Sequence, residues 1–256
     1  MNCLVFAIRT VPDIEGGRRL YGLEGIADED VVTAMSTLRY QQTDGHSDRL
    51  PHQLQRIAAI AVLERCQDGL GCRVLEAAET GEAALIRALL MRIEPHPVPL
   101  VSWGGRAFAL PVLSYRALLH GLGMTGVVDR GDDDRGGAPG RTRLQARHLD
   151  LQAALAVGDP AAEAPLGQLA RLLGLPAGSG LDDAALWRQF RAGELAAMHG
   201  DCLTEVLNVY LIYLRYEHLH GRLDAGTVDR EHARLRDWLA QAGGDHAREY
   251  LAHWRR

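Results

Sequence analysis

The sequence contains no lysine, so arginine carries every basic side chain apart from histidine. This absence excludes mechanisms that depend on the lysine amine, including Walker-type phosphate loops, Schiff-base enzymes and kinases. The cysteines, Cys3, Cys66, Cys72 and Cys202, are scattered and form no Cys-x-x-Cys pair. They are therefore expected to be reduced thiols, and the sequence indicates neither a disulfide framework nor a zinc site.

Long apolar runs are also missing. No stretch approaches the roughly 18–20 apolar residues that a membrane-spanning helix needs, and no signal-peptide pattern stands at the N-terminus. The net charge of −5 provides no global basic field, which argues against tight sequence-independent nucleic-acid binding but not against contacts within one groove. We expect a cytoplasmic protein with no membrane partner, and its 256 residues suffice for one α/β domain with a well-buried core.

Apolar spacing and turn signals predict strands and helices in alternation over the first half of the chain. Strands are expected at 4–8 and 100–103, a β-hairpin at 55–64 and 72–78, and helices at 28–42 (behind an Asp cap), 80–93 and 111–120. Residues 129–143 are rich in Gly, Asp and Arg and predict a surface loop. Beyond residue 151 the pattern is helical almost to the end. This order predicts a mixed α/β sheet flanked by helices, with a helical C-terminal third.

Three segments carry a motif pattern. Residues 4–13 read Leu-Val-Phe-Ala-Ile-Arg-Thr-Val-Pro-Asp, and residues 100–113 read Leu-Val-Ser-Trp-Gly-Gly-Arg-Ala-Phe-Ala-Leu-Pro-Val-Leu. They resemble the first two motifs of the 3′–5′ exonucleases related to the proofreading domain of B-family DNA polymerases, Phe-Asp-Ile-Glu-Thr-Val-Pro-Asp and Asn-Gly-x-x-Phe-Asp-Leu-Pro. Residues 201–210, Asp-Cys-Leu-Thr-Glu-Val-Leu-Asn-Val-Tyr, resemble the third motif of that family, Tyr-Cys-Glu-x-Asp-Val-Leu-Asn-Thr-Tyr. Segments 54–57, 148–151 and 166–176 also resemble family segments.

The resemblance implies a ribonuclease-H-like (DnaQ-like) fold. It further implies an exonuclease-type domain over residues 1–222 and a C-terminal helical extension, residues 223–256, packed on the same domain. The activity of the family is metal-dependent 3′–5′ hydrolysis of nucleic-acid ends. In a two-metal mechanism the Mg²⁺ or Mn²⁺ ions lie roughly 3.5–4 Å apart, and they repel each other strongly unless converging carboxylates hold them.

This chain departs from the family at the catalytic positions. Ala7 and Arg9 stand where the first motif has Asp and Glu, and Ala109 stands where the second has Asp. In the third motif Asp201 replaces the Tyr and Glu205 replaces the Asp. Only Asp201 and Glu205 are acidic, so they are the only family positions that could hold a metal. A two-metal centre, and hence any cofactor, is not expected.

Several alternatives remain open from the residues alone. Asp13, Glu15 and Asp150 could act as substitute ligands, although Asp13 suits a role in shaping the loop after Pro12 and Asp150 suits a helix cap. Arg9 could pair with Glu205 or with Asp201, which would replace the metals by an internal salt bridge.

The sequence therefore predicts an inactive exonuclease homologue that binds single-stranded nucleic acid weakly, through Arg9, Arg106 and Phe108. One alternative is a residually active enzyme with a relocated metal site built from Glu205, Asp201 and Asp150. Another is a non-enzymatic scaffold that binds a partner protein through its C-terminal helices.

Overall fold

The computed structural model describes residues 2–67, 69–93, 98–124 and 147–255. Within these residues, strands form one sheet in the order β3-β2-β1-β4-β5. The central strand β1 (Cys3–Pro12) pairs antiparallel with β2 (Gln55–Cys66) and parallel with β4 (Leu100–Ser102). The edge strands β3 (Gly69–Glu76) and β5 (His148–Asp150) pair antiparallel with β2 and parallel with β4, respectively. This mixed sheet confirms the expected ribonuclease-H-like fold class.

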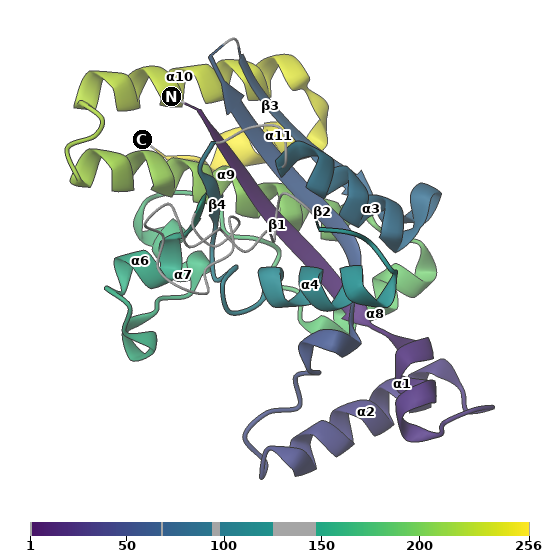
Figure 1. Ribbon diagram of the computed structural model, residues 1–256. Helices are drawn as coiled ribbons and strands as arrows, with labels where there is room; N and C mark the ends of the chain where they lie inside the picture. The colour runs from purple at the N-terminus through teal and green to yellow at the C-terminus, as the bar shows by residue number, and fades with distance from the viewer. Residues whose placement is uncertain (1, 68, 94–97, 125–146, 256) are drawn as a thin grey trace.

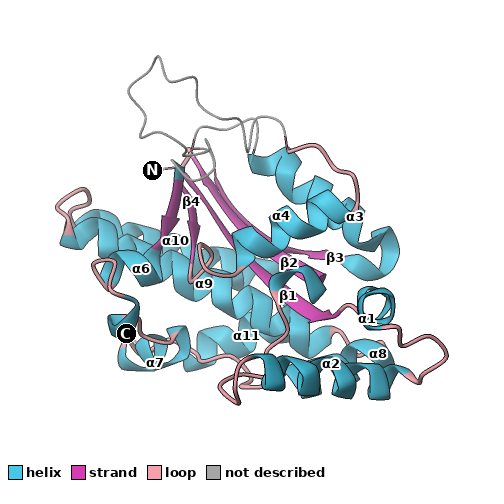
Figure 2. Cartoon of the chain, turned by 60° about the horizontal axis from the view of Figure 1, so that its bottom comes forward, coloured by secondary structure: helices cyan, strands magenta, loops and turns pink. Residues whose placement is uncertain are grey.

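Helices cover both faces of the sheet (Figures 1 and 2). Among the described residues, the helices that precede β5 in the chain are α1 (Ile14–Tyr21), α2 (Asp28–Gln42), the 3₁₀ turn η1 (His52–Leu54), α3 (Ala77–Ile93) and α4 (Ala109–Leu119). Those that follow it are α6 (Leu151–Leu155), η3 (Pro160–Ala162), α7 (Leu166–Leu172), α8 (Asp183–Ala192), α9 (Ala196–Leu219), α10 (Ala225–Ala242) and α11 (Gly244–His253). None of the described helices is long and apolar enough to span a membrane.

The alternation of side chains along β1 decides which residues face which layer. Cys3, Val5 and Ala7 belong to a buried cluster with α9, whereas Leu4 and Phe6 belong to a second cluster with α3 and α4. Successive strand residues point to opposite faces, so Arg9 lies on the same side as Ala7, facing α9. The pairing of β1 with β2 also shifts register between Arg9 and Thr10, which marks a β-bulge at this point.

The C-terminal helices pack on this same core. Apolar residues of α10 and α11, including Leu235, Leu239 and Tyr250, are buried with α9. Glu231 of α10 forms a buried ion pair with Arg65 of β2, 2.7 Å between Oε2 and Nε, and accepts a hydrogen bond from the Tyr210 hydroxyl. Side chains from α9, α10 and the sheet therefore form one continuous interior.

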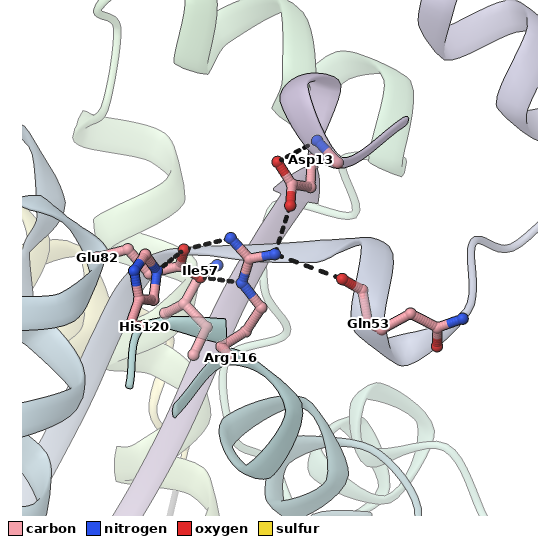
Figure 3. Close-up of polar contacts among 7 residues, drawn as sticks. Asp13, Gln53, Ile57, Glu82, Arg116 and His120 are labelled. Atoms are coloured by element: carbon pink, nitrogen blue, oxygen red, sulfur yellow. Dashed lines mark hydrogen bonds and ion pairs between the residues drawn. The ribbon is translucent and has the colours of Figure 1, made fainter. Parts of the chain in front are cut away.

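A second buried polar cluster connects α4 with α3 and with Asp13, which directly follows β1 (Figure 3). Arg116 of α4 donates to both Glu82 oxygens, at 2.8 and 2.5 Å, and to Asp13 at 2.5 Å. Glu82 also accepts the backbone N–H of Ile57 and contacts His120. The positive φ of 74° at Gly81 kinks α3 just before Glu82, a backbone conformation that glycine adopts without strain.

Most predicted elements are confirmed. The hairpin, the strand at the N-terminus and the helix over 28–42 are present, while the helix expected from 111 begins two residues earlier, at Ala109. The expected Asp cap of α2 is wrong, because the N-cap is Ala27 and makes no side-chain capping bond. The acidic side chains of α2 lie in its first turn instead, where they still interact favourably with the helix dipole. The loop predicted at 129–143 lies outside the described residues.

Candidate functional site

β1 and α9 bring the first and third motif positions together. Arg9 projects from β1 toward α9, on which Asp201 and Glu205 lie one helical turn apart, i and i+4. The intervening Cys202 is fully buried, and its Sγ lies 3.5 Å from the carbonyl oxygen of Ala7, which it contacts as a weak donor. These contacts fix α9 directly over the β1 segment that resembles the first motif.

An ion pair occupies the centre of this arrangement. Arg9 Nη1 lies 2.6 Å from Glu205 Oε2, and both side chains are 21% exposed. Arg9 also donates to the backbone carbonyl of Ile8 at 3.2 Å and to that of Asp201 at 3.3 Å. Burial disfavours the charge on Arg9, but the Glu205 carboxylate outweighs it, so the pKa of Arg9 is raised. Of the two pairings that the sequence left open, the structure has the one with Glu205.

Asp201 has a different partner. Its carboxylate accepts the backbone N–H of Ser179 at 2.6 Å and the Ser179 hydroxyl at 2.5 Å. Ser179 belongs to the loop between α7 and α8. The carboxylate at the family tyrosine position therefore holds this loop against the start of α9.

The remaining family positions supply no ligand. Ala7 and Ala109 are buried, at 2% and 6% exposed, and have no side-chain oxygen. Arg9 places a guanidinium on the one carboxylate that stands at a family ligand position. Within the described residues, no group of three or more His, Cys, Asp or Glu side chains is suited to hold a metal ion. The donor set at this site does not fit a pair of divalent cations, because a fixed positive charge lies among too few oxygens.

The substitute ligands considered from the sequence have other roles. Asp13 caps α1 by accepting from the Gly16 N–H, and it pairs with Arg116. Asp150 caps α6 and accepts the backbone N–H groups of Gly104 and Arg106, each at 2.9 Å. Glu15 is an exposed partner of Arg18. None of these carboxylates contacts the Arg9–Glu205 pair.

A cleft of about 370 Å³ opens beside the ion pair. Three arginines, Arg9, Arg49 and Arg171, line it together with Phe108, and the Arg49 guanidinium lies 4.3 Å from the centre of the Phe108 ring. Asp183 and Asp201 line it too, so its positive charges are largely compensated. Of the three residues predicted to bind nucleic acid, Arg9 and Phe108 both line this cleft, and their role in binding stays a prediction.

Arg106 is not among the residues that line this cleft. Its side chain is exposed, and its backbone N–H contacts Asp150. Sequence reasoning had missed Arg49, which lies outside the segments that resemble the family, and Arg171, which lies within one of them. Their exposed positions before η1 and on α7 become informative only once the fold places both segments at the mouth of the cleft.

One protein family matches more than half of this chain. Residues 47–254 match the family described as predicted 3′-5′ exonuclease related to the exonuclease domain of PolB. The chain therefore belongs to this exonuclease family. The matched range begins after β1, so the position of Arg9 rests on the geometry above.

Among solved structures, the chain is similar to the family B DNA polymerase from the hyperthermophilic archaeon Pyrobaculum calidifontis. The identity is 16% and the TM-score 0.46, and the match covers 84% of this chain and 25% of the polymerase. The chain thus spans about a quarter of the length of that polymerase. No curated protein matches the chain.

Proposed function

We propose that this chain is a 3′–5′ exonuclease homologue that does not hydrolyse nucleic acid and that binds single-stranded nucleic acid weakly, without a metal ion. One observation carries the proposal: Arg9 Nη1 lies 2.6 Å from Glu205 Oε2. The internal cation takes the place that divalent ions have in the family. It supplies charge balance to Glu205 but cannot lower the pKa of a bound water to generate a hydroxide, as a metal ion does.

The change in charge supports the loss of hydrolysis. Relative to the family motifs, Ala7, Arg9 and Ala109 replace three carboxylates by two neutral groups and one cation. A relocated site is disfavoured by the contacts of the carboxylates that would build it. Asp150 caps α6, Asp201 holds Ser179, and Glu205 pairs with Arg9.

Residual nucleic-acid binding is supported by the composition of the cleft. Arg49 and Arg171 have exposed side chains that could contact phosphate oxygens, and Phe108 provides an aromatic face for a base. Asp183 and Asp201 in the same cleft limit the attraction, which is why the binding is proposed to be weak. The scaffold alternative has less support, because none of the large apolar side chains that the structure exposes lies on α10 or α11.

A nuclease assay tests the proposed inactivity. The unmodified protein should leave a 3′-labelled single-stranded oligonucleotide intact in Mn²⁺. The combined substitution Ala7→Asp, Arg9→Glu, Ala109→Asp and Asp201→Tyr should restore some hydrolysis, whereas each single change should not, because the ligands act as a unit. Hydrolysis by the unmodified protein that both EDTA and Glu205→Ala abolish would instead support the relocated site that includes Glu205.

Fluorescence anisotropy with the same oligonucleotide tests the binding. Affinity should be independent of divalent ions and should fall with rising salt, because phosphate contacts release counterions. Arg49→Glu and Arg171→Glu should each weaken it. Arg19→Glu, the same charge change at an exposed site on α1, should have a much smaller effect. Equal losses of affinity in all three variants, or no binding even at low salt, would contradict nucleic-acid binding in the cleft.

A further inference from the structure

A second hollow lies on the other side of α7 and differs in character from the cleft. Its volume is about 420 Å³, and it lies between α6, η3, α7 and the C-terminal half of α9. We call it the apolar groove. Its apolar walls include Trp103, Leu155, Leu169, Leu173, Ile212 and Leu219. Gly167 and Arg171 of α7 line the cleft, whereas Leu169 and Leu173 line the groove, so the two hollows are separate.

The rim of the groove exposes large apolar side chains to solvent. Leu219 is 72% exposed, and Leu155 is 38% exposed. Nearby in the sequence, Leu172 of α7 and Val157, two residues after α6, are 85% and 93% exposed. Clusters of exposed apolar groups of this kind mark binding sites more often than ordinary surface.

The backbone at Val157 adds an independent observation. Its φ is 53°, in the left-handed region, which is a true outlier for a β-branched residue. Strained positions of this type cost roughly 1–3 kcal/mol each and concentrate at functional sites. Here the left-handed conformation of Val157 turns the chain just after α6, the helix that forms one wall of the groove.

One formal charge lines the apolar groove. Arg215 of α9 is exposed, and in the part of the chain that the structure describes no carboxylate pairs with it. The other polar side chains on the wall are Gln152 and Tyr216, and the Gln152 amide already donates to the Ala164 carbonyl. An apolar trough with a single unpaired cation is complementary to a ligand that has an apolar body and one negative charge.

We propose that the apolar groove binds a small amphipathic carboxylate, with its acyl chain on the leucine walls and its carboxylate paired with Arg215. This site is independent of the proposed loss of nuclease activity, because it shares none of the groups at the Arg9–Glu205 pair. The acyl chain gains affinity by leaving water, up to about fourfold for each methylene that is fully buried. The charge-assisted pair with Arg215 selects the carboxylate head.

Calorimetric titration of the full chain with decanoate, below its micelle concentration, tests this site. Binding should saturate at one molecule per chain, octanoate should bind more weakly, and decyltrimethylammonium, with the same chain and opposite charge, should not bind. Arg215→Gln and Leu219→Glu should each weaken decanoate binding at least tenfold. Both side chains are exposed, and Arg234→Gln on α10, 46% exposed, is the matched control that should bind as the unmodified protein does.

Three results would overturn the proposal. The first is the absence of saturable decanoate binding, and the second is decanoate binding that Arg215→Gln and Leu219→Glu leave unchanged. The third is a dimer in solution that Leu219→Glu converts to monomers, which would assign the groove to a second copy of this chain. The nuclease and oligonucleotide assays report on the cleft alone, so failure of the groove proposal and failure of the proposed function are distinguished.

Discussion

Replacing Glu231 by glutamine should destabilise the fold strongly, although the site lies far from the candidate cleft in the sequence. The Glu231 carboxylate accepts two hydrogen bonds from Arg65, at 2.7 and 2.8 Å, and one from Tyr210 at 2.8 Å. The side chains of Arg65 and Glu231 are only 5% and 6% exposed. Glu231→Gln removes the negative charge and leaves the Arg65 guanidinium buried without its counter-ion.

The expected loss can be worked in two ways. Burial alone would raise the pKa of Glu231, but the hydrogen bonds from Arg65 and Tyr210 outweigh it and hold the pKa at about 2, compared with an ordinary value of 4.5. That difference corresponds to about 3 kcal/mol at neutral pH. Breaking a buried ion pair by removing one partner costs about 3–5 kcal/mol. Both routes give a loss of about 3 kcal/mol or more in the free energy of unfolding.

Urea denaturation followed by circular dichroism at pH 7 would measure this loss. Two control variants should each lose less stability than Glu231→Gln. Tyr210→Phe removes one neutral donor and should cost about 1 kcal/mol, and Arg234→Gln removes an exposed partner of the same carboxylate and should cost less than about 1 kcal/mol. A Glu231→Gln variant as stable as Arg234→Gln would refute the reasoning. Because a carboxyl with a lowered pKa stabilises above its unfolded value, this contribution should disappear as pH falls from about 4.5 through about 2.

Three further outcomes are expected. No saturable binding of Mg²⁺ or Mn²⁺ should occur at low millimolar concentrations, because Arg9 pairs with Glu205; a melting temperature that rises with Mn²⁺ and then levels off would contradict this. Burial lowers the pKa of His148 to about 4, so the unfolded chain takes up the proton first, and stability should fall by up to about 3 kcal/mol as pH drops from about 6.5 to 4. Urea titrations across that range should show a flatter dependence for His148→Gln. Gly105→Ala should cost about 1–3 kcal/mol in the same assay, because its added Cβ would lie 2.9 Å from the Cβ of buried Ser102; an unchanged midpoint would show that the turn adjusts freely.

The fold could be predicted from local patterns because its main signals are local. The apolar run over 4–8, the hairpin pattern over 55–64 and 72–78 and the helical spacing over 28–42 are each set by residues close together in the sequence. The strand, the strand pairing and the helix that they predict are confirmed. The capping of α2 was mispredicted because acidic residues are favourable both at the N-cap and in the first turn. Sequence alone does not separate those two positions.

The candidate site was only partly predictable, since its contacts join distant residues. Arg9 and Glu205 are 196 residues apart, and Asp201, one turn away from Glu205, was an equally reasonable partner from sequence. The structure decides between them because Ser179 takes the Asp201 carboxylate. The buried pair of Arg116 and Glu82 had no sequence signal at all, because a helix kink at Gly81 is what lets Glu82 enter the interior.

The Arg9–Glu205 ion pair also affects the order in which single substitutions could bring this chain back to the family ligands. Arg9→Glu alone would set two carboxylates against each other at a half-buried position without a cation. Ala7→Asp or Ala109→Asp alone would add a buried carboxylate before any metal could compensate it. Each first step toward the family pattern is therefore expected to cost stability and, under the proposed function, to restore no hydrolysis. We therefore expect the four substitutions to act non-additively, with the ion pair opposing restoration of the family ligands one position at a time.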